Sequence, residues 1–185
     1  MPPEQQVGSS NLSGRTISKK LRDIPETPFV NCDEMLTVEL RPACDQDFVF
    51  ARSVYFETMR WIIERLSGWD EAREWKKFAQ FFKLDEVRII IADGRNVGWI
   101  QEQVDDTTIN LGSFYVIPAM QRRGIGTTVL GLLLANARKQ SKAVTLAVVK
   151  INPARSFYEK HGFRTTHEDE HKFYMRTDPA LPLSE

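Results

Sequence analysis

The chain has 185 residues, of which 42% are hydrophobic and 27% charged, a composition typical of one soluble globular domain with some excess at its ends. Lys and Arg together number 25, as do Asp and Glu, and this balance argues against a nucleic-acid-binding protein, which usually carries a basic excess. The two cysteines make no disulfide framework, and no apolar run reaches the roughly 20 residues of a membrane-spanning helix, so we expect a cytoplasmic protein.

Three segments are expected along the chain. Residues 1–34 are polar and rich in Ser, Thr and Pro without an apolar period, which is typical of a flexible N-terminal extension. A targeting role is less favoured, because this segment lacks an amphipathic, arginine-rich pattern. Residues 35–178 are expected to form one folded domain, and residues 179–185, with two prolines, a short C-terminal tail.

The domain is predicted to begin with a strand and two helices. Residues 36–40 alternate apolar and polar side chains, as a half-buried strand does. Asp45 or Asp47 is expected to cap the first helix, which Gly68 ends, and Asp70 to cap the second. The apolar face of the first helix contains Phe48, Ala51, Tyr55, Met59, Ile62 and Leu66. The apolar face of the second contains Ala72, Trp75, Ala79 and Phe82.

Three strands are predicted next. Residues 87–92 are mostly β-branched, and Asp93-Gly94 after them is a strong hairpin-turn signal. Residues 97–102 are expected to form the returning strand, and residues 108–116 a third. Three consecutive antiparallel strands therefore precede the second half of the domain.

After Pro118 the pattern changes to alternating helices and strands. The wide apolar face of residues 128–139 predicts a helix packed on a sheet, and the nearly continuous apolar run 143–149 predicts a strand buried on both faces. Strand, helix and strand at this spacing form a βαβ unit with parallel strands. With a helix over 153–160 and a last strand over 172–176, the fold class is α/β, with a mixed, mostly antiparallel central sheet flanked by helices.

The first candidate binding site is the turn Gln121 to Gly126, with the sequence QRRGIG. Its glycines let a ligand approach the backbone, the following helix presents free N–H groups, and Arg122 and Arg123 add positive charge. These features favour a ligand that carries a diphosphate, with an ordinary tight turn as the alternative. A P-loop would need a Gly-Lys-Ser/Thr sequence here, and a Rossmann fingerprint a third glycine, and both are missing.

Two ordered motifs resemble the GNAT superfamily of N-acetyltransferases. Residues 116–127, VIPAMQRRGIGT, are similar to that family's main acetyl-CoA motif, Gln/Arg-x-x-Gly-x-Gly/Ala. Residues 152–163, NPARSFYEKHGF, resemble its second segment, which runs from an Asn through an Ala and a Tyr to Gly-Phe. The resemblance covers roughly residues 36–177 and implies direct acetyl transfer from acetyl-CoA, the cosubstrate, to an amine, without a covalent enzyme intermediate or a metal.

The resemblance also implies which residues hold acetyl-CoA. The strand backbone at Phe114 to Val116 would hold the acetyl and pantetheine portions, and the N–H groups from Arg122 to Thr127 the pyrophosphate. Asn152 would contact the cofactor where the two parallel strands part. The full set expected to bind the cofactor is Phe114, Tyr115, Val116, Gln121, Arg122, Arg123, Gly124, Ile125, Gly126, Thr127, Asn152, Ala154, Phe157 and Tyr158.

Two catalytic residues are expected. Tyr158 matches the family tyrosine that faces the thioester sulfur, where its phenol would protonate the leaving thiolate; simple packing beneath the cofactor is the alternative. Some relatives carry a basic glutamate where this chain has Asn110, and an amide cannot act as a base. Glu102 on the preceding strand is therefore the expected base, with Glu39, Glu57 or a chain of water molecules as alternatives.

The acceptor is expected to be a primary amine of a small molecule, and the resemblance implies that it binds between the first helices and the later strands. A protein or peptide acetyltransferase and a non-catalytic acyl-CoA sensor remain open, as does a homodimer. Tyr55 and Trp75 are expected to fill the core, and Trp61 to face a pocket or solvent. Residues 167–171, HEDEH, fit a solvated hairpin turn better than a metal site, because strand alternation places neighbours on opposite faces.

Overall fold

The computed structural model describes residues 36–178. The predicted N-terminal extension, residues 1–34, and the predicted tail, residues 179–185, lie outside this range. Between residues 36 and 178, no helix is both long enough and apolar enough to cross a membrane.

Seven strands form one sheet in the order β1-β2-β3-β4-β5-β7-β6. Neighbouring strands are antiparallel except for β4 and β5, which run parallel, so the predicted mixed sheet is confirmed. The strands are β1 (Val38–Pro42), β2 (Val87–Ala92), β3 (Arg95–Val104), β4 (Thr108–Val116), β5 (Ala143–Val149), β6 (Arg164–Glu168) and β7 (Lys172–Arg176).

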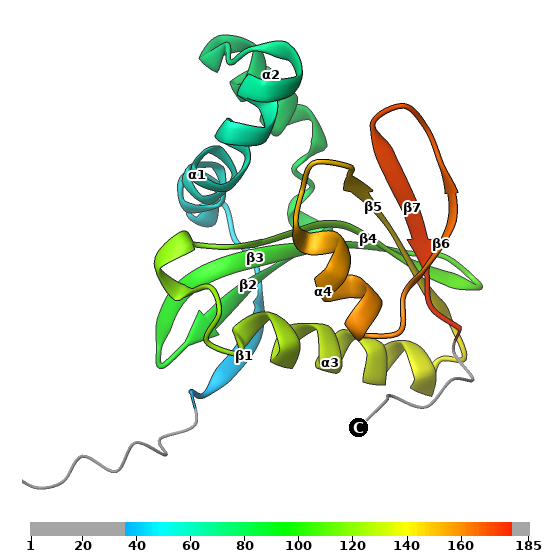
Figure 1. Ribbon diagram of the computed structural model, residues 1–185. Helices are drawn as coiled ribbons and strands as arrows, with labels where there is room; N and C mark the ends of the chain where they lie inside the picture. Colours follow the sequence, from blue (N-terminus) through cyan, green and yellow to red (C-terminus); the bar gives the residue numbers. More distant parts are fainter. Residues whose placement is uncertain (1–35, 179–185) are drawn as a thin grey trace, which may run out of the picture. The chain divides into compact units, whose positions relative to one another are not determined.

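Four α-helices cover the two faces of this sheet. Figure 1 shows α1 and α2 on one face and α3 and α4 on the other. The helices are α1 (Asp47–Ser67), α2 (Glu71–Phe81), α3 (Ile125–Lys139) and α4 (Ala154–Lys160), with short 3-10 turns η1 (Leu84–Glu86) and η2 (Pro118–Met120). The face under α1 and α2 is called the α1 face below, and the opposite one the α3 face.

Alternation along the central strands produces two hydrophobic cores. Trp99 and Ile100 are adjacent on β3 and are both 0% exposed, yet Trp99 packs with the residues of α1 and α2, and Ile100 with those of α3. The Trp99 indole N–H donates to the Ala51 carbonyl oxygen of α1 at 2.9 Å, so the buried polar atom is satisfied. The sheet is therefore packed between two layers of helices.

The buried face of α2 differs from the prediction. Ala72 and Ala79 are exposed and Trp75 is 45% exposed, whereas Glu74 and Phe78 are buried. The Glu74 carboxylate accepts hydrogen bonds from Tyr55, Arg73 and Lys77, which compensate its burial. Phe82, 8% exposed, is buried as predicted. The apolar pattern misplaces the other three residues, because it does not count a paired carboxylate as a core residue.

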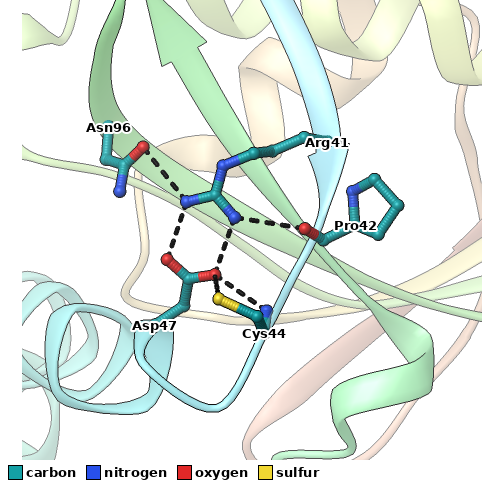
Figure 2. A network of polar contacts seen from close by, with 5 residues as sticks. All are labelled: Arg41, Pro42, Cys44, Asp47 and Asn96. Carbon is teal, nitrogen blue, oxygen red and sulfur yellow. Dashed lines mark hydrogen bonds and ion pairs between the residues drawn. The ribbon is translucent and has the colours of Figure 1, made fainter.

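The predicted aspartate cap of α1 is also wrong, because Gln46 is the N-cap residue and makes no side-chain capping bond. Asp47 lies in the first turn, and both of its carboxylate oxygens accept from the Arg41 guanidinium at 2.7 Å (Figure 2). The Cys44 backbone N–H donates to the same carboxylate at 2.8 Å. This network, which Asn96 also joins, ties the end of β1 to the start of α1.

Candidate active site

The parallel strands β4 and β5 are paired over only part of their length. Their pairing joins residues 108–111 to residues 143–146 and ends there, although both strands continue. At the same point Gly112 forms a β-bulge, because Gln101 pairs with Ser113 and Glu102 with Leu111. Beyond the bulge β5 remains paired with β7, and β4 with β3. The sheet therefore parts between β4 and β5, and the edge of β4 from Ser113 to Val116 faces this opening.

Two backbone N–H groups of β4 point into the opening. The Ile117 N–H donates to the Val97 carbonyl oxygen of β3 at 2.8 Å. Because antiparallel strands alternate between bonded and non-bonded positions, Ser113 and Tyr115 also bond to β3, and the N–H groups of Phe114 and Val116 face away from it. Those two donors lie on the side where β5 has separated, so they suit an extended ligand inserted between the strands.

The turn from Gln121 to Thr127 lies at the end of the same strand. The Gln121 side-chain amide donates to the Val116 carbonyl oxygen at 2.8 Å, which fixes the turn onto β4. Arg122 and Gly124 have positive φ angles of 61° and 83°, a backbone shape that glycine adopts without strain. Helix α3 begins at Ile125, three residues earlier than predicted, so Gly126 and Thr127 belong to its first turn.

The N-terminus of α3 has the properties of an anion site. Its N-cap residue is Gly124, which makes no side-chain capping bond, so the first N–H groups of this 15-residue helix have no side-chain cap. Arg122 and Arg123 are both exposed beside it. Unpaired N–H groups, the helix dipole and two guanidinium groups together favour a phosphate-bearing ligand.

Helix α4 completes the surroundings of the opening. The Asn152 side-chain oxygen accepts from the Ala154 N–H at 2.9 Å, which fixes the loop between β5 and α4. The Phe157 ring packs 6.3 Å from that of Phe114, and a Cβ atom built on Gly126 would lie 3.4 Å from it. The structure thus brings β4, the α3 turn and α4 together, as the resemblance implies.

Three tyrosines lie near one another at this point. Tyr158 packs against Phe163 with 5.6 Å between ring centroids, and its hydroxyl has no hydrogen-bond partner within residues 36–178. Burial raises the pKa of the Tyr158 phenol, and electrostatic interaction with Tyr115 raises it further. Burial also raises the pKa of Tyr115 to about 12. The Tyr115 ring is 5.7 Å from that of Tyr55, whose pKa is raised by burial, by Tyr115 and by the Glu74 carboxylate.

The expected bases do not lie at this site. Glu102 is on the α3 face, where its carboxylate is paired with the Arg88 guanidinium, whereas Asn110 is on the α1 face. Glu39 is exposed on the edge strand β1, and Glu57 is exposed on α1. The ion pair therefore holds Glu102 on the α3 face, whereas a base at the position of Asn110 would lie on the α1 face.

Sequence reasoning missed a row of polar side chains on the α1 face. The amides of Gln101 and Gln103 on β3 both donate to the Glu86 carboxylate, at 2.7 and 3.2 Å. The Asn110 amide of β4 lies 3.5 Å from the Gln103 side-chain oxygen, and the Thr145 hydroxyl of β5 donates to Asn110 at 3.4 Å. The alternation of Gln101 and Gln103 along β3 was visible in the sequence. The carboxylate that they contact, Glu86, lies outside β3 and β4 and could not be linked to them by a strand pattern.

The Gln101 side-chain oxygen has an unused bonding capacity. Gln101 is 6% exposed, and its Oε1 atom has no hydrogen-bond partner within the described residues. The amide orientation is fixed, because its nitrogen faces two acceptors, the Phe81 carbonyl oxygen at 2.8 Å and the Glu86 carboxylate. A buried acceptor without a donor costs about 1–3 kcal/mol, which makes this oxygen a candidate ligand contact.

Comparisons with known proteins agree with this geometry. Residues 84–165 match the family profile described as Acetyltransferase (GNAT) domain. No curated protein sequence matches the chain. Among solved structures, the PaiA N-acetyltransferase of Thermoplasma acidophilum in complex with coenzyme A is 22% identical, with a TM-score of 0.66 over 77% of this chain and 99% of that chain.

Of two other similar structures, one is named for a protein substrate and one was solved with a bisubstrate analogue. The ribosomal-protein-S18-alanine N-acetyltransferase of Escherichia coli is 19% identical, with a TM-score of 0.58 over 79% of this chain and 96% of its own. Arabidopsis thaliana Naa50, solved with the bisubstrate analogue CoA-Ac-MVNAL, is 16% identical, with a TM-score of 0.55 over 76% of this chain and 98% of its own. At these identities the likeness shows the fold alone.

Proposed function

Because residues 84–165 form a GNAT acetyltransferase domain, we propose that the chain transfers an acetyl group from acetyl-CoA to a primary amine of a small molecule. The observation that carries this proposal is the opening between β4 and β5, which adjoins the uncapped N-terminus of α3. An extended thioester has donors along its length there, and its diphosphate has a helix terminus.

In the proposed complex, the N–H groups from Arg122 to Thr127 bind the pyrophosphate, with Arg122 and Arg123 adding charge. The pantetheine arm lies along β4, where the free N–H groups of Phe114 and Val116 bind it as a neighbouring strand would. Gln121 supports the turn, and Asn152, Ala154 and Phe157 close the α4 side of the arm. No metal has a role in this arrangement.

The reaction begins when the unprotonated amine attacks the thioester carbonyl carbon. Negative charge develops on the carbonyl oxygen, and a backbone N–H such as that of Val116 stabilises it. The C–S bond then breaks, and CoA leaves as a thiolate. The Tyr158 phenol, whose pKa is raised by burial, is protonated at neutral pH and can donate a hydrogen bond to the departing sulfur.

The amine must lose a proton for the product amide to form. Asn110 cannot accept it, and the ion pair with Arg88 holds Glu102 on the α3 face. We therefore favour the water chain over Glu102 as the base, with water beside Gln103 and Asn110 on the α1 face leading the proton towards solvent. If Glu102 were the base, it would be essential. If water is the base, removal of the Glu102 carboxylate should have a small effect.

The favoured acceptor is a small molecule, because α1 and α2 cover the α1 face with packed aromatic rings. Tyr55, Phe78 and Phe81 lie within 5.6 Å of one another, measured between ring centroids. A peptide acceptor is the second candidate, and the peptide-acetylating proteins of the same fold support it. A non-catalytic acyl-CoA sensor is the third, because Asn110 stands where some relatives carry a base.

A thiol-release assay tests this function. Purified protein, acetyl-CoA and a panel of polyamines, amino acids, aminoglycosides and peptides are mixed, and the acetylated product is identified by mass spectrometry. At least one small amine is expected to raise CoA release well above hydrolysis. Release with peptides alone would favour the second candidate, and acetyl-CoA binding without release under any condition would favour the sensor.

A further inference from the structure

The acceptor side contains a carboxylate whose charge has no partner. Glu86, the last residue of η1, is partly buried beside β3, and no Lys or Arg within residues 36–178 forms an ion pair with it. Its contacts are the neutral amides of Gln101 and Gln103. By contrast, the buried carboxylates of Asp47 and Glu74 are both paired with cations. A partly buried carboxylate held only by amides is open to a cation.

A second acceptor atom lies beside that carboxylate. The Gln101 Oε1 atom belongs to the same amide whose nitrogen donates to Glu86 at 2.7 Å, and it has no donor within the described chain. A carboxylate and an amide oxygen, both without an opposing charge or donor, match an ammonium group, which has three N–H donors and no acceptor. Lys and Arg side chains of the described residues do not fill this role.

The position of these two atoms relates them to the reaction proposed above. Gln101 pairs with Ser113, the residue immediately before Phe114, whose N–H faces the opening between β4 and β5. Adjacent strands lie about 5 Å apart, so Gln101 and Glu86 are roughly one to two strand spacings, about 5–10 Å, from the opening. Gln103 and Asn110 continue the same polar row across β3 and β4, where β4 is still paired with β5. A second amine a few carbons from the reacting one spans this distance.

We propose that the acceptor is an aliphatic diamine or polyamine, whose second ammonium group binds the Glu86 carboxylate and the Gln101 side-chain oxygen while the first is acetylated. This inference rests on the proposed acetyl transfer and adds the chemical class of its acceptor. Glu86 and Gln101 are specificity residues in it, because they bind the acceptor away from the reacting atoms.

The test compares 1,4-diaminobutane with butylamine, which has the same carbon chain and lacks the second ammonium group. Steady-state kinetics of the full chain at saturating acetyl-CoA should give a KM at least 10-fold lower for the diamine. Glu86→Gln should raise the diamine KM about 10-fold and the butylamine KM less than 2-fold, with kcat changed less than 2-fold for both. Asp85→Asn, which removes the exposed charge next to Glu86, is the matched control and should change neither KM.

Several outcomes would overturn the proposal. Equal changes of KM for both amines would mean that Glu86 only supports the local structure, and a loss of kcat with a shifted pH profile would make it the base. If Glu86→Gln does not fold, the wild-type KM ratio decides: it should exceed 10 and fall as salt screens the ammonium contact, and a ratio near one contradicts the proposal.

Failure of the acetyl transfer itself has a separate signature. Butylamine turnover and calorimetric binding of acetyl-CoA report on the proposed function without involving Glu86. If both succeed and the diamine has no advantage, the function stands and the diamine site is refuted. If no amine is acetylated, calorimetry of 1,4-diaminobutane with CoA present tests the diamine site on its own. Binding of the diamine would support the site, and absence of binding would rule it out.

Discussion

At the scale of single residues, Tyr158 is the side chain whose chemistry the proposed reaction needs most directly. Its hydroxyl has no partner in the described chain, and its pKa is raised by burial and by Tyr115, so it is a neutral donor at neutral pH. We predict that Tyr158→Phe lowers kcat about 100-fold, since general acid catalysis contributes 10²–10⁴-fold, and leaves acetyl-CoA affinity within 2-fold. Tyr174→Phe, which removes the Tyr174–Asp169 hydrogen bond on the exposed hairpin, is the control. Unchanged kcat in Tyr158→Phe would mean that this tyrosine only packs.

Asp47 gives a second residue-scale prediction, on stability. The Arg41 hydrogen bonds hold the pKa of the Asp47 carboxyl well below its usual range, so its stabilisation is present above the unfolded pKa of about 3.9 and is lost as pH falls below it. Asp47→Asn should lower the free energy of unfolding by about 1–3 kcal/mol at pH 7 and by less at pH 3. Urea denaturation at both pH values measures this. Asp45→Asn, on the exposed part of the same loop, should have little effect, and a pH-independent loss in Asp47→Asn would contradict the assignment.

At the scale of secondary-structure elements, the close pairing of β3 and β4 depends on Gly98. A Cβ atom at this position would lie 2.1 Å from the Tyr115 carbonyl oxygen, a distance that requires the two strands to move apart. Gly98→Ala should therefore destabilise the fold by about 1–3 kcal/mol or more and reduce acetyl-CoA binding, because the β4 edge shifts. Gly131→Ala in α3, where a Cβ atom meets nothing within 4 Å, should be neutral or stabilising by up to about 1 kcal/mol. Thermal melts of both variants check the opposite signs.

The elements themselves were largely predictable from the sequence, and their contacts were less so. The strands β2, β4, β5 and β7 have the predicted bounds, because β-branched runs and turn residues determine them locally. The buried face of α2 was missed because Glu74 is paired with Arg73 and Lys77 of its own helix and accepts a hydrogen bond from Tyr55 of α1, contacts that an apolar pattern does not contain. The relation between Glu102 and Asn110 could not be predicted from single strands: Glu102 shares the face of Ile100 by alternation along β3, and the bulge at Gly112 in β4 puts Asn110 on the opposite face.

At the scale of the whole molecule, the two faces of the sheet have different proposed roles. The α3 face provides the turn from Gln121 to Thr127 and helix α4 for the proposed cofactor, and the α1 face provides aromatic and polar surroundings for the proposed acceptor. The opening between β4 and β5 connects the two faces. The water-mediated proton path proposed above follows from the same division, because Glu102 lies on the cofactor side.

This arrangement predicts a small effect for Glu102. Glu102→Gln should leave kcat within about 3-fold, with the reaction still accelerating as pH rises towards the amine pKa of about 10.4, because the amine must be unprotonated to attack. A pH–rate profile of the wild type and the variant measures this. Its matched control is Arg88→Gln, which breaks the same ion pair from the other side and should have the same small effect. A 100-fold loss in Glu102→Gln alone would identify Glu102 as the base.

Amide hydrogen exchange followed by NMR tests the central claim most directly. The N–H groups of Phe114 and Val116 face the opening without a strand partner, so in the free protein they should exchange faster than those of Ser113 and Tyr115. Saturating acetyl-CoA should slow exchange at Phe114, Val116 and the first turn of α3 by at least about 10-fold, since bound carbonyl and phosphate oxygens accept from them. Exchange that acetyl-CoA leaves unchanged at these amides would contradict the account.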